Sequence, residues 1–251
     1  MLGIFKPKLP VSDSQRLWVD ESFVRLSRLL GADRMMSATV MLPIAEHFPD
    51  TYDRSETAVG KMFCRIAERM AVDPETVELD LFEDTENVTS TLMPLVSGKS
   101  SSAGGIYSHH DDTKTQVLIN TSQLKTPESL VATIAHELGH VILLRPGLVG
   151  GDEEDMEPLN DLLTVFLGFG VFNANAAFQF KQFTNNDSQG WSTRRLGYLS
   201  QEMFAYALAR FAFERGEMKP DWARYLTTNV AAYFQRSLAW LKANGSSLGL
   251  G

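Results

Sequence analysis

The sequence has little cysteine and little positive charge. Its one cysteine in 251 residues, Cys64, excludes a disulfide within the chain, and it also excludes a cysteine-rich zinc knuckle or an iron–sulfur site, which need several thiolates. The 23 Lys and Arg are outnumbered by 31 Asp and Glu, which gives a net charge of −8, and the basic residues form no block. We therefore expect no nucleic acid and no membrane as a partner. Any bound metal must be held by histidine and carboxylate side chains.

Long hydrophobic runs are also missing. The longest, Leu162–Phe172, has 11 residues, whereas a helix that spans a bilayer needs about 20. We interpret this run as a buried helix. The N-terminal sequence MLGIFKPKLP has lysines and prolines where a secretory signal peptide would have its apolar run, so we expect a cytoplasmic protein.

Periodicity predicts helices and strands in the first part of the chain. Apolar residues recur at helical spacing over residues 12–31 and again over residues 55–73, and both segments have capping residues at their ends. Cys64 lies in the second of these helices, and we interpret it as a small buried hydrophobe. Residues 77–81 alternate between apolar and acidic, which is the period of a strand exposed on one face. Residues 92–96 are predicted to form a short strand, and the proline among them places it at the edge of a sheet.

The middle of the chain predicts a hairpin followed by a long helix. Residues 104–107 and 116–120 are the two predicted strands. The helix begins with Thr126 as N-cap and Pro127 at the first helical position. One of its faces is apolar, and a second face carries two histidines one turn apart. Further helices are predicted to begin at Pro158, Ser200 and Pro220.

These elements predict an α+β fold in which a small sheet packs on the long middle helix, with helical parts before and after it. We divide the chain into an N-terminal helical and strand-bearing part (1–90), a core (91–178), a C-terminal helical part (179–245) and a flexible tail (246–251). We expect the first three parts to form one compact unit.

The long helix carries the one motif that indicates chemistry. Residues 136–140 read His-Glu-Leu-Gly-His, the H-E-x-x-H pattern of metal-dependent hydrolases. Residues four apart share a helix face, so the imidazoles of His136 and His140 can both bind one ion at about 2.0–2.1 Å. Glu137 is rotated by about 100° from His136, which places its carboxylate beside a metal-bound water and not on the metal. It is the predicted general base for that water.

This motif, with its surroundings from about residue 104 to 172, resembles the zincin metallopeptidases. The resemblance implies a zincin-like fold, one zinc ion per chain and a peptide or protein substrate. It also implies an edge strand that binds the substrate backbone by strand addition. We favour the segment Gly105, Ile106 and Tyr107 over residues 117–120 for this strand, because glycine permits close approach of another backbone.

A catalytic zinc site of this kind needs a third protein ligand. The metzincin pattern has a third histidine six residues after the second, but that position is Pro146 and no histidine follows His140. The gluzincin pattern has a glutamate on a second helix and, four residues later, an aspartate that orients the first histidine. Glu157 and Asp161 match it, so the resemblance implies Glu157 as third ligand and Asp161 as acceptor for His136. Three neighbouring acids are alternatives for the third ligand: Glu153, Glu154 and Asp155.

Zincins also carry a group that stabilises the oxyanion of the tetrahedral intermediate. The candidates here are Tyr198, Tyr206 and His109, with His110 and the Arg194-Arg195 pair as alternatives.

The sequence thus predicts a zinc-dependent hydrolase, in particular a peptidase with gluzincin-like ligands. One alternative is a zincin fold that binds or regulates a partner and has a metal site but no general proteolytic activity. The other is a structural zinc site with all four positions filled, which the isolated cysteine disfavours. The sequence predicts no oligomeric state.

Overall fold

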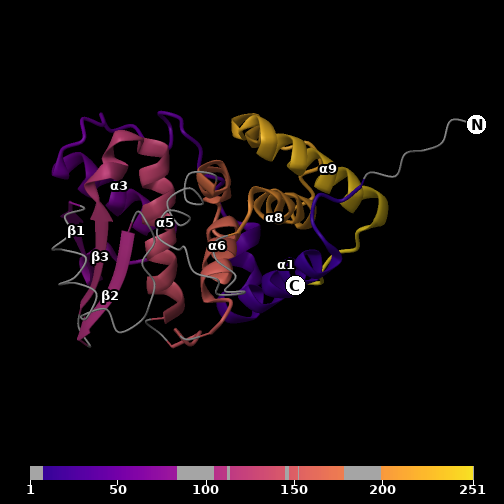
Figure 1. The fold of residues 1–251 in the computed structure, drawn as a ribbon, viewed down its shortest axis with the longest axis horizontal. Coiled ribbons are helices and arrows are strands. Elements are labelled where there is room, and N and C mark those ends of the chain that lie inside the picture. The colour runs from indigo at the N-terminus through magenta and orange to yellow at the C-terminus, as the bar shows by residue number, and fades with distance from the viewer. Residues whose placement is uncertain are drawn as a thin grey trace, which may run out of the picture. The chain divides into compact units, whose positions relative to one another are not determined.

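The computed structural model describes residues 8–83, 105–111, 114–144, 147–151, 153–177 and 199–250. These residues are mostly helical and form two compact units (Figure 1). The first unit contains the described residues of 1–42, 162–178 and 199–251, and the second contains those of 43–161. Each part predicted from the sequence was one continuous stretch of the chain. The first unit instead combines segments from the beginning, the middle and the end of the chain.

The second unit contains a three-stranded sheet. Strands β1 (Val77–Phe82), β2 (Gly105–Asp111) and β3 (Lys114–Asn120) are ordered β1-β3-β2, with β3 parallel to β1 and antiparallel to β2. The predicted hairpin and the predicted strand at 77–81 are therefore confirmed. The strand predicted at 92–96 lies outside the described residues.

Two helices of the second unit contact each other, and one of them packs on the sheet. α3 (Glu56–Arg69) begins after Ser55, whose hydroxyl accepts from the backbone N–H of Ala58, as the predicted cap requires. Its apolar stripe is buried, but Cys64 is exposed, so its prediction as a buried residue was wrong. Cys64 directly follows Phe63 of the stripe, and one residue is a rotation of about 100° around a helix.

α5 (Pro127–Leu144) contacts α3, β2 and β3, and Figure 1 shows it beside the sheet. It is the predicted long helix that carries the motif. Every residue from Ser129 to Leu143 is buried, on the polar face as well as the apolar one. Burial of a polar face is costly unless its groups find partners, so the histidine face must be satisfied inside the protein.

The predicted helix from Pro158 through Phe172 is interrupted. α6 (Met156–Phe166) ends before Gly168, and a second helix covers residues 170–177. Gly168 has φ 90°, a backbone conformation that favours glycine, and a Cβ at this position would collide with the carbonyl oxygen of Thr39. The carbonyl of Gly168 accepts from the N–H of Met41 at 2.9 Å. A tertiary contact with a distant segment therefore sets the break.

Helices form the first unit. α1 (Asp13–Leu30) lies within the predicted residues 12–31; Ser12 is its N-cap and forms a capping box with Gln15, and α2 (Ala32–Met36) follows it. α8 (Gln201–Glu214) packs against α1 and against α9 (Thr228–Asn244). No helix in the described part of the chain combines the length and the apolarity that crossing a membrane requires.

The predicted helix from Pro220 is also split, into a short 3-10 helix (Asp221–Tyr225) and α9. The side chain of Asn175 binds the backbone at the split: its Nδ2 donates to the carbonyl of Tyr225, and its Oδ1 accepts from the N–H of Thr227, both at 2.8 Å. These bonds satisfy backbone groups at the split, where the chain leaves the helical conformation.

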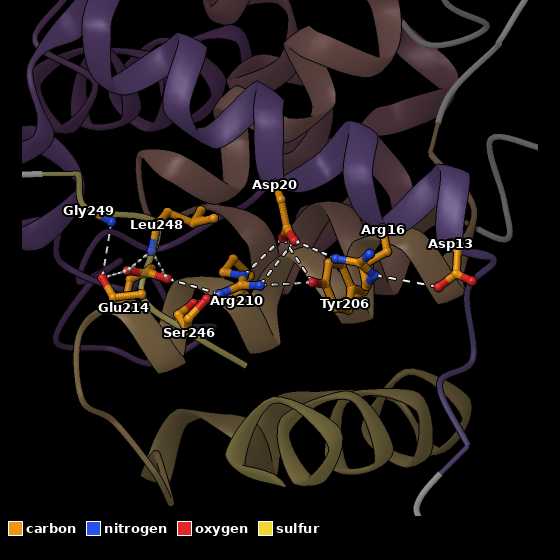
Figure 2. Close-up of polar contacts among 10 residues, drawn as sticks. Asp13, Arg16, Asp20, Tyr206, Arg210, Glu214, Ser246, Leu248 and Gly249 are labelled. Carbon is orange, nitrogen blue, oxygen red and sulfur yellow. Dashed lines mark hydrogen bonds and ion pairs between the residues drawn. The ribbon is translucent and has the colours of Figure 1, made fainter. Parts of the chain in front are cut away.

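A buried polar cluster joins α1 to α8 in the first unit (Figure 2). Arg210 binds Asp20 through Nε and Nη2 at 3.0 and 3.1 Å, and the hydroxyl of Tyr206 donates to Asp20 at 2.9 Å. The remaining Arg210 N–H groups reach Tyr206, Glu214 and the carbonyl of Ser246. A guanidinium has five N–H donors, and all five have an acceptor here.

The segment Ser246–Gly249, which we call the strap, was predicted to be flexible but is held by this cluster (Figure 2). Glu214 accepts from the N–H of Leu248 at 3.1 Å and from the hydroxyl of Ser247 at 2.8 Å. The strap was predicted to be flexible because its sequence is rich in Ser and Gly. Composition does not indicate the contacts with α8 that hold it.

Candidate metal centre

The motif residues and the predicted third ligand meet in the second unit. α5 supplies His136 and His140, and the first turn of α6 supplies Glu157. Glu157 Oε2 lies 3.2 Å from Nε2 of His136 and 3.6 Å from Nε2 of His140. One ligand atom of each residue lies within 4.8 Å of the others, which makes the three a group that could hold a metal ion.

The spacing of these atoms fits a small tetrahedral ion. With metal–ligand bonds of about 2.0–2.1 Å, two ligand atoms of a tetrahedral site lie about 3.3 Å apart. The two distances from Glu157 to the imidazoles, 3.2 and 3.6 Å, are close to this value. Two imidazoles and one carboxylate are also a donor set that catalytic zinc sites use. The residues present therefore fit zinc.

Asp161 binds the first imidazole from its other side. Its Oδ1 lies 3.0 Å from Nδ1 of His136, and both side chains are buried. A carboxylate accepts from Nδ1–H, which leaves the lone pair of Nε2 for a metal. Because Asp161 follows Glu157 by four residues, one face of α6 supplies both carboxylates.

The electrostatics of the group favour a positive charge. Burial opposes the charged form of His136, but hydrogen bonds to Asp161 and Glu157, together with their negative charges, raise the pKa of His136 well above its usual value. Burial would likewise raise the pKa of the Glu157 carboxyl, yet hydrogen bonds from His136 and His140 lower it below its usual range. A proton or a metal cation between these side chains offsets the buried carboxylate charge.

Glu157 is the most exposed of the three side chains. Its side chain is 24% exposed, whereas those of His136 and His140 are 5% and 0% exposed. Glu137, the predicted base, is also buried, at 1% exposure. The two imidazoles are thus buried, and the Glu157 carboxylate is partly exposed.

The three alternative acids do not join the histidines in the described residues. Glu153 accepts from the N–H of Gly150 at 3.1 Å and so closes a turn, and Glu154 is exposed. The backbone carbonyl of Asp155 accepts from Leu159 at the start of α6. Of the four acids considered for the third ligand, Glu157 is the one that the fold groups with both histidines.

The residues predicted to contact the substrate or the oxyanion lie in different parts of the chain. Tyr206 lies in the first unit, where its hydroxyl binds Asp20 and Arg210, and this contact gives it a structural role that its prediction had not considered. Tyr198 and the Arg194-Arg195 pair lie outside the described residues, so their roles stay predictions. His109, His110 and the segment Gly105, Ile106 and Tyr107 all lie on β2, which pairs with β3 alone among the described strands. Substrate binding along β2 also stays a prediction.

Sequence analysis missed two residues beside the group. Asn160, on α6, donates from Nδ2 to the backbone carbonyl of His136 at 2.8 Å. Gly139, inside the motif, lies so close to Asn160 that a Cβ on it would collide with the Asn160 side chain. The sequence does show a glycine within a long helix and an asparagine three residues after the predicted ligand Glu157. Neither residue indicates a contact unless it is known that α5 and α6 meet at this point.

Comparisons with known proteins add no relative. No protein-family model, no curated protein and no solved structure matches the chain. The resemblance to zincins therefore rests on the H-E-x-x-H spacing and on the buried group of His136, His140 and Glu157.

Proposed function

We propose that the protein is a zinc-dependent peptidase in which His136, His140 and Glu157 hold one zinc ion and Glu137 is the general base. The observation that carries this proposal is the buried His/His/Glu group, with Asp161 hydrogen-bonded to the first histidine. A zinc ion held there would polarise a scissile carbonyl and acidify a bound water. Peptide or protein is the proposed substrate class.

The roles of the side chains follow from their places on the helices. His136 and His140 bind through Nε2, and Asp161 keeps a proton on Nδ1 of His136. Glu137 follows His136 directly on α5 and is buried, so its carboxylate is not a surface group. In the proposed reaction Glu137 accepts a proton from the attacking water and passes it to the leaving amine.

Zinc content and cleavage, measured separately, test this function. We expect wild type to contain about one zinc per chain by elemental analysis and to cleave members of a peptide library. Glu137→Gln should keep the zinc and lower cleavage by about 10²–10⁴-fold, because general acid–base catalysis contributes about that factor. His140→Ala should lose both zinc and cleavage.

Each contrary result has a distinct meaning. If Glu137→Gln cleaves as fast as wild type, the assigned base is wrong. If wild type holds zinc but cleaves no peptide and resists a hydroxamate inhibitor, the site is not catalytic. If wild type and His140→Ala hold the same amount of zinc, these residues do not form the metal site.

A further inference from the structure

Asn160 connects α6 to the backbone of the motif helix. It lies on α6 between Glu157 and Asp161 and is fully buried. Its Nδ2 donates to the carbonyl oxygen of His136 at 2.8 Å. In an α-helix that carbonyl also accepts from the N–H of the residue four positions later, here His140. One amide therefore reaches the backbone link between the two histidines.

The contact requires glycine on the facing helix. A Cβ on Gly139 would collide with Oδ1 of Asn160 and would lie 3.0 Å from its Cγ. Gly139 is not among the glycines with positive φ, so space and not backbone conformation demands glycine here. Glycine inside a helix is less favourable than alanine. The close approach of Asn160 is thus maintained at the expense of the stability of α5.

The stability of the fold does not explain why position 160 is an asparagine. Its Oδ1 is buried and has no hydrogen-bond donor in the described part of the chain. An unsatisfied buried acceptor lowers stability, and an apolar residue of similar shape avoids that penalty. The pair Asn160 and Gly139 therefore combines two locally unfavourable choices at the point where the ligand-bearing helices meet.

We propose that Asn160, seated against Gly139, sets the position of the first turn of α6 and so holds the Glu157 carboxylate at the histidines. Asn160 is a positioning residue, because it acts through Glu157 and not on the metal or the substrate. It follows Glu157 by three residues, so a shift of Asn160 moves the carboxylate with it. This inference rests on the proposed function in assuming that the group binds zinc.

The first test measures zinc affinity by competition with a chromogenic chelator, and the thermal midpoint of the metal-free protein separately. Asn160→Leu keeps the side-chain shape and removes the hydrogen bond. We expect it to weaken zinc binding by about 10–100-fold, the usual effect of losing a group that supports a ligand, with a small change in the metal-free midpoint. Asn160→Ala should show the same loss of affinity. Asn173→Ala, which changes a buried asparagine of the first unit, is the control and should leave affinity within about two-fold of wild type.

A double-mutant cycle tests the contact itself. Gly139→Ala alone should weaken zinc binding, because its Cβ displaces Asn160. The same change in the Asn160→Ala background should weaken binding much less, since the colliding atoms are gone. Two residues in contact show such non-additivity, whereas independent residues do not.

The outcomes separate this inference from the proposed function. If wild type binds no zinc, the proposed function fails and the inference fails with it. If wild type binds zinc and both Asn160 variants bind within two-fold of it, the proposed function stands and the positioning role is overturned. If the Asn160 variants lose only thermal stability, or if the cycle is additive, Asn160 is structural. Asn160→Leu keeps the test valid should Asn160→Ala fail to fold.

Discussion

Asp161 does not bind the proposed metal, but its negative charge acts on the ligand His136 through a hydrogen bond. It accepts from Nδ1 of His136 at 3.0 Å and is buried. Asp161→Asn keeps an oxygen acceptor but removes the negative charge that makes Nε2 more basic. We expect zinc affinity to fall by about 10–100-fold, measured by chelator competition. Asp155→Asn, which removes a charge six residues earlier and just before α6, should have little effect, and equal losses in both variants would indicate a general charge effect.

Sequence patterns located the ligand residues but not the residues that support them. Helical spacing is enough to place His136 and His140 on one face, and the E-x-x-x-D spacing is enough to place Glu157 and Asp161 on another. The roles of Asn160 and Gly139 depend on where α6 touches α5, and this crossing is set by packing between residues distant in sequence. Such a contact has no local signal.

Elements were predictable where local signals decide their ends. α1 begins and ends within the predicted residues 12–31, and α5 begins at Pro127, as predicted. Two predicted helices were instead split, where Gly168 meets the Thr39 carbonyl and where Asn175 binds the backbone after Tyr225. In both cases a tertiary contact overrides helical periodicity.

Two side chains of α8, Arg210 and Glu214, bind the strap, and Glu214 binds two of its residues. Glu214 accepts from Leu248 N–H, from the Ser247 hydroxyl and from Arg210 (Figure 2). Glu214→Gln replaces one acceptor oxygen by a donor, so it leaves buried groups without a partner. We expect a loss of about 1–3 kcal/mol in the free energy of unfolding, measured with urea, and faster hydrogen exchange in the strap.

The control for this prediction is Glu21→Gln, which removes an exposed carboxylate from α1 of the same unit. A surface substitution of this kind should stay within about 0.5 kcal/mol of wild type. If Glu214→Gln is equally mild, the strap is ordered by something other than Glu214.

At the scale of the whole molecule, the proposed metal group and the buried Arg210 cluster belong to different units. His136, His140 and Glu157 all lie in the second unit, although α6 itself continues into the first. Each unit therefore has its own polar centre: one links α5 to the start of α6, and the other links α1 to α8. A ligand at the first centre should stabilise the contacts of that unit first.

Hydrogen exchange with and without zinc tests this separation. A ligand that binds only the native state stabilises it, by about 2.7 kcal/mol at a concentration 100 times its dissociation constant. Openings that separate His136 and His140 from Glu157 must release the zinc, so we expect zinc to slow exchange in α5 and in the first turn of α6. Openings of α8 and α9 leave the group intact, and their exchange should not change. His140→Ala should abolish the effect of zinc. Equal slowing in α5 and α8 would instead show that the two units open together.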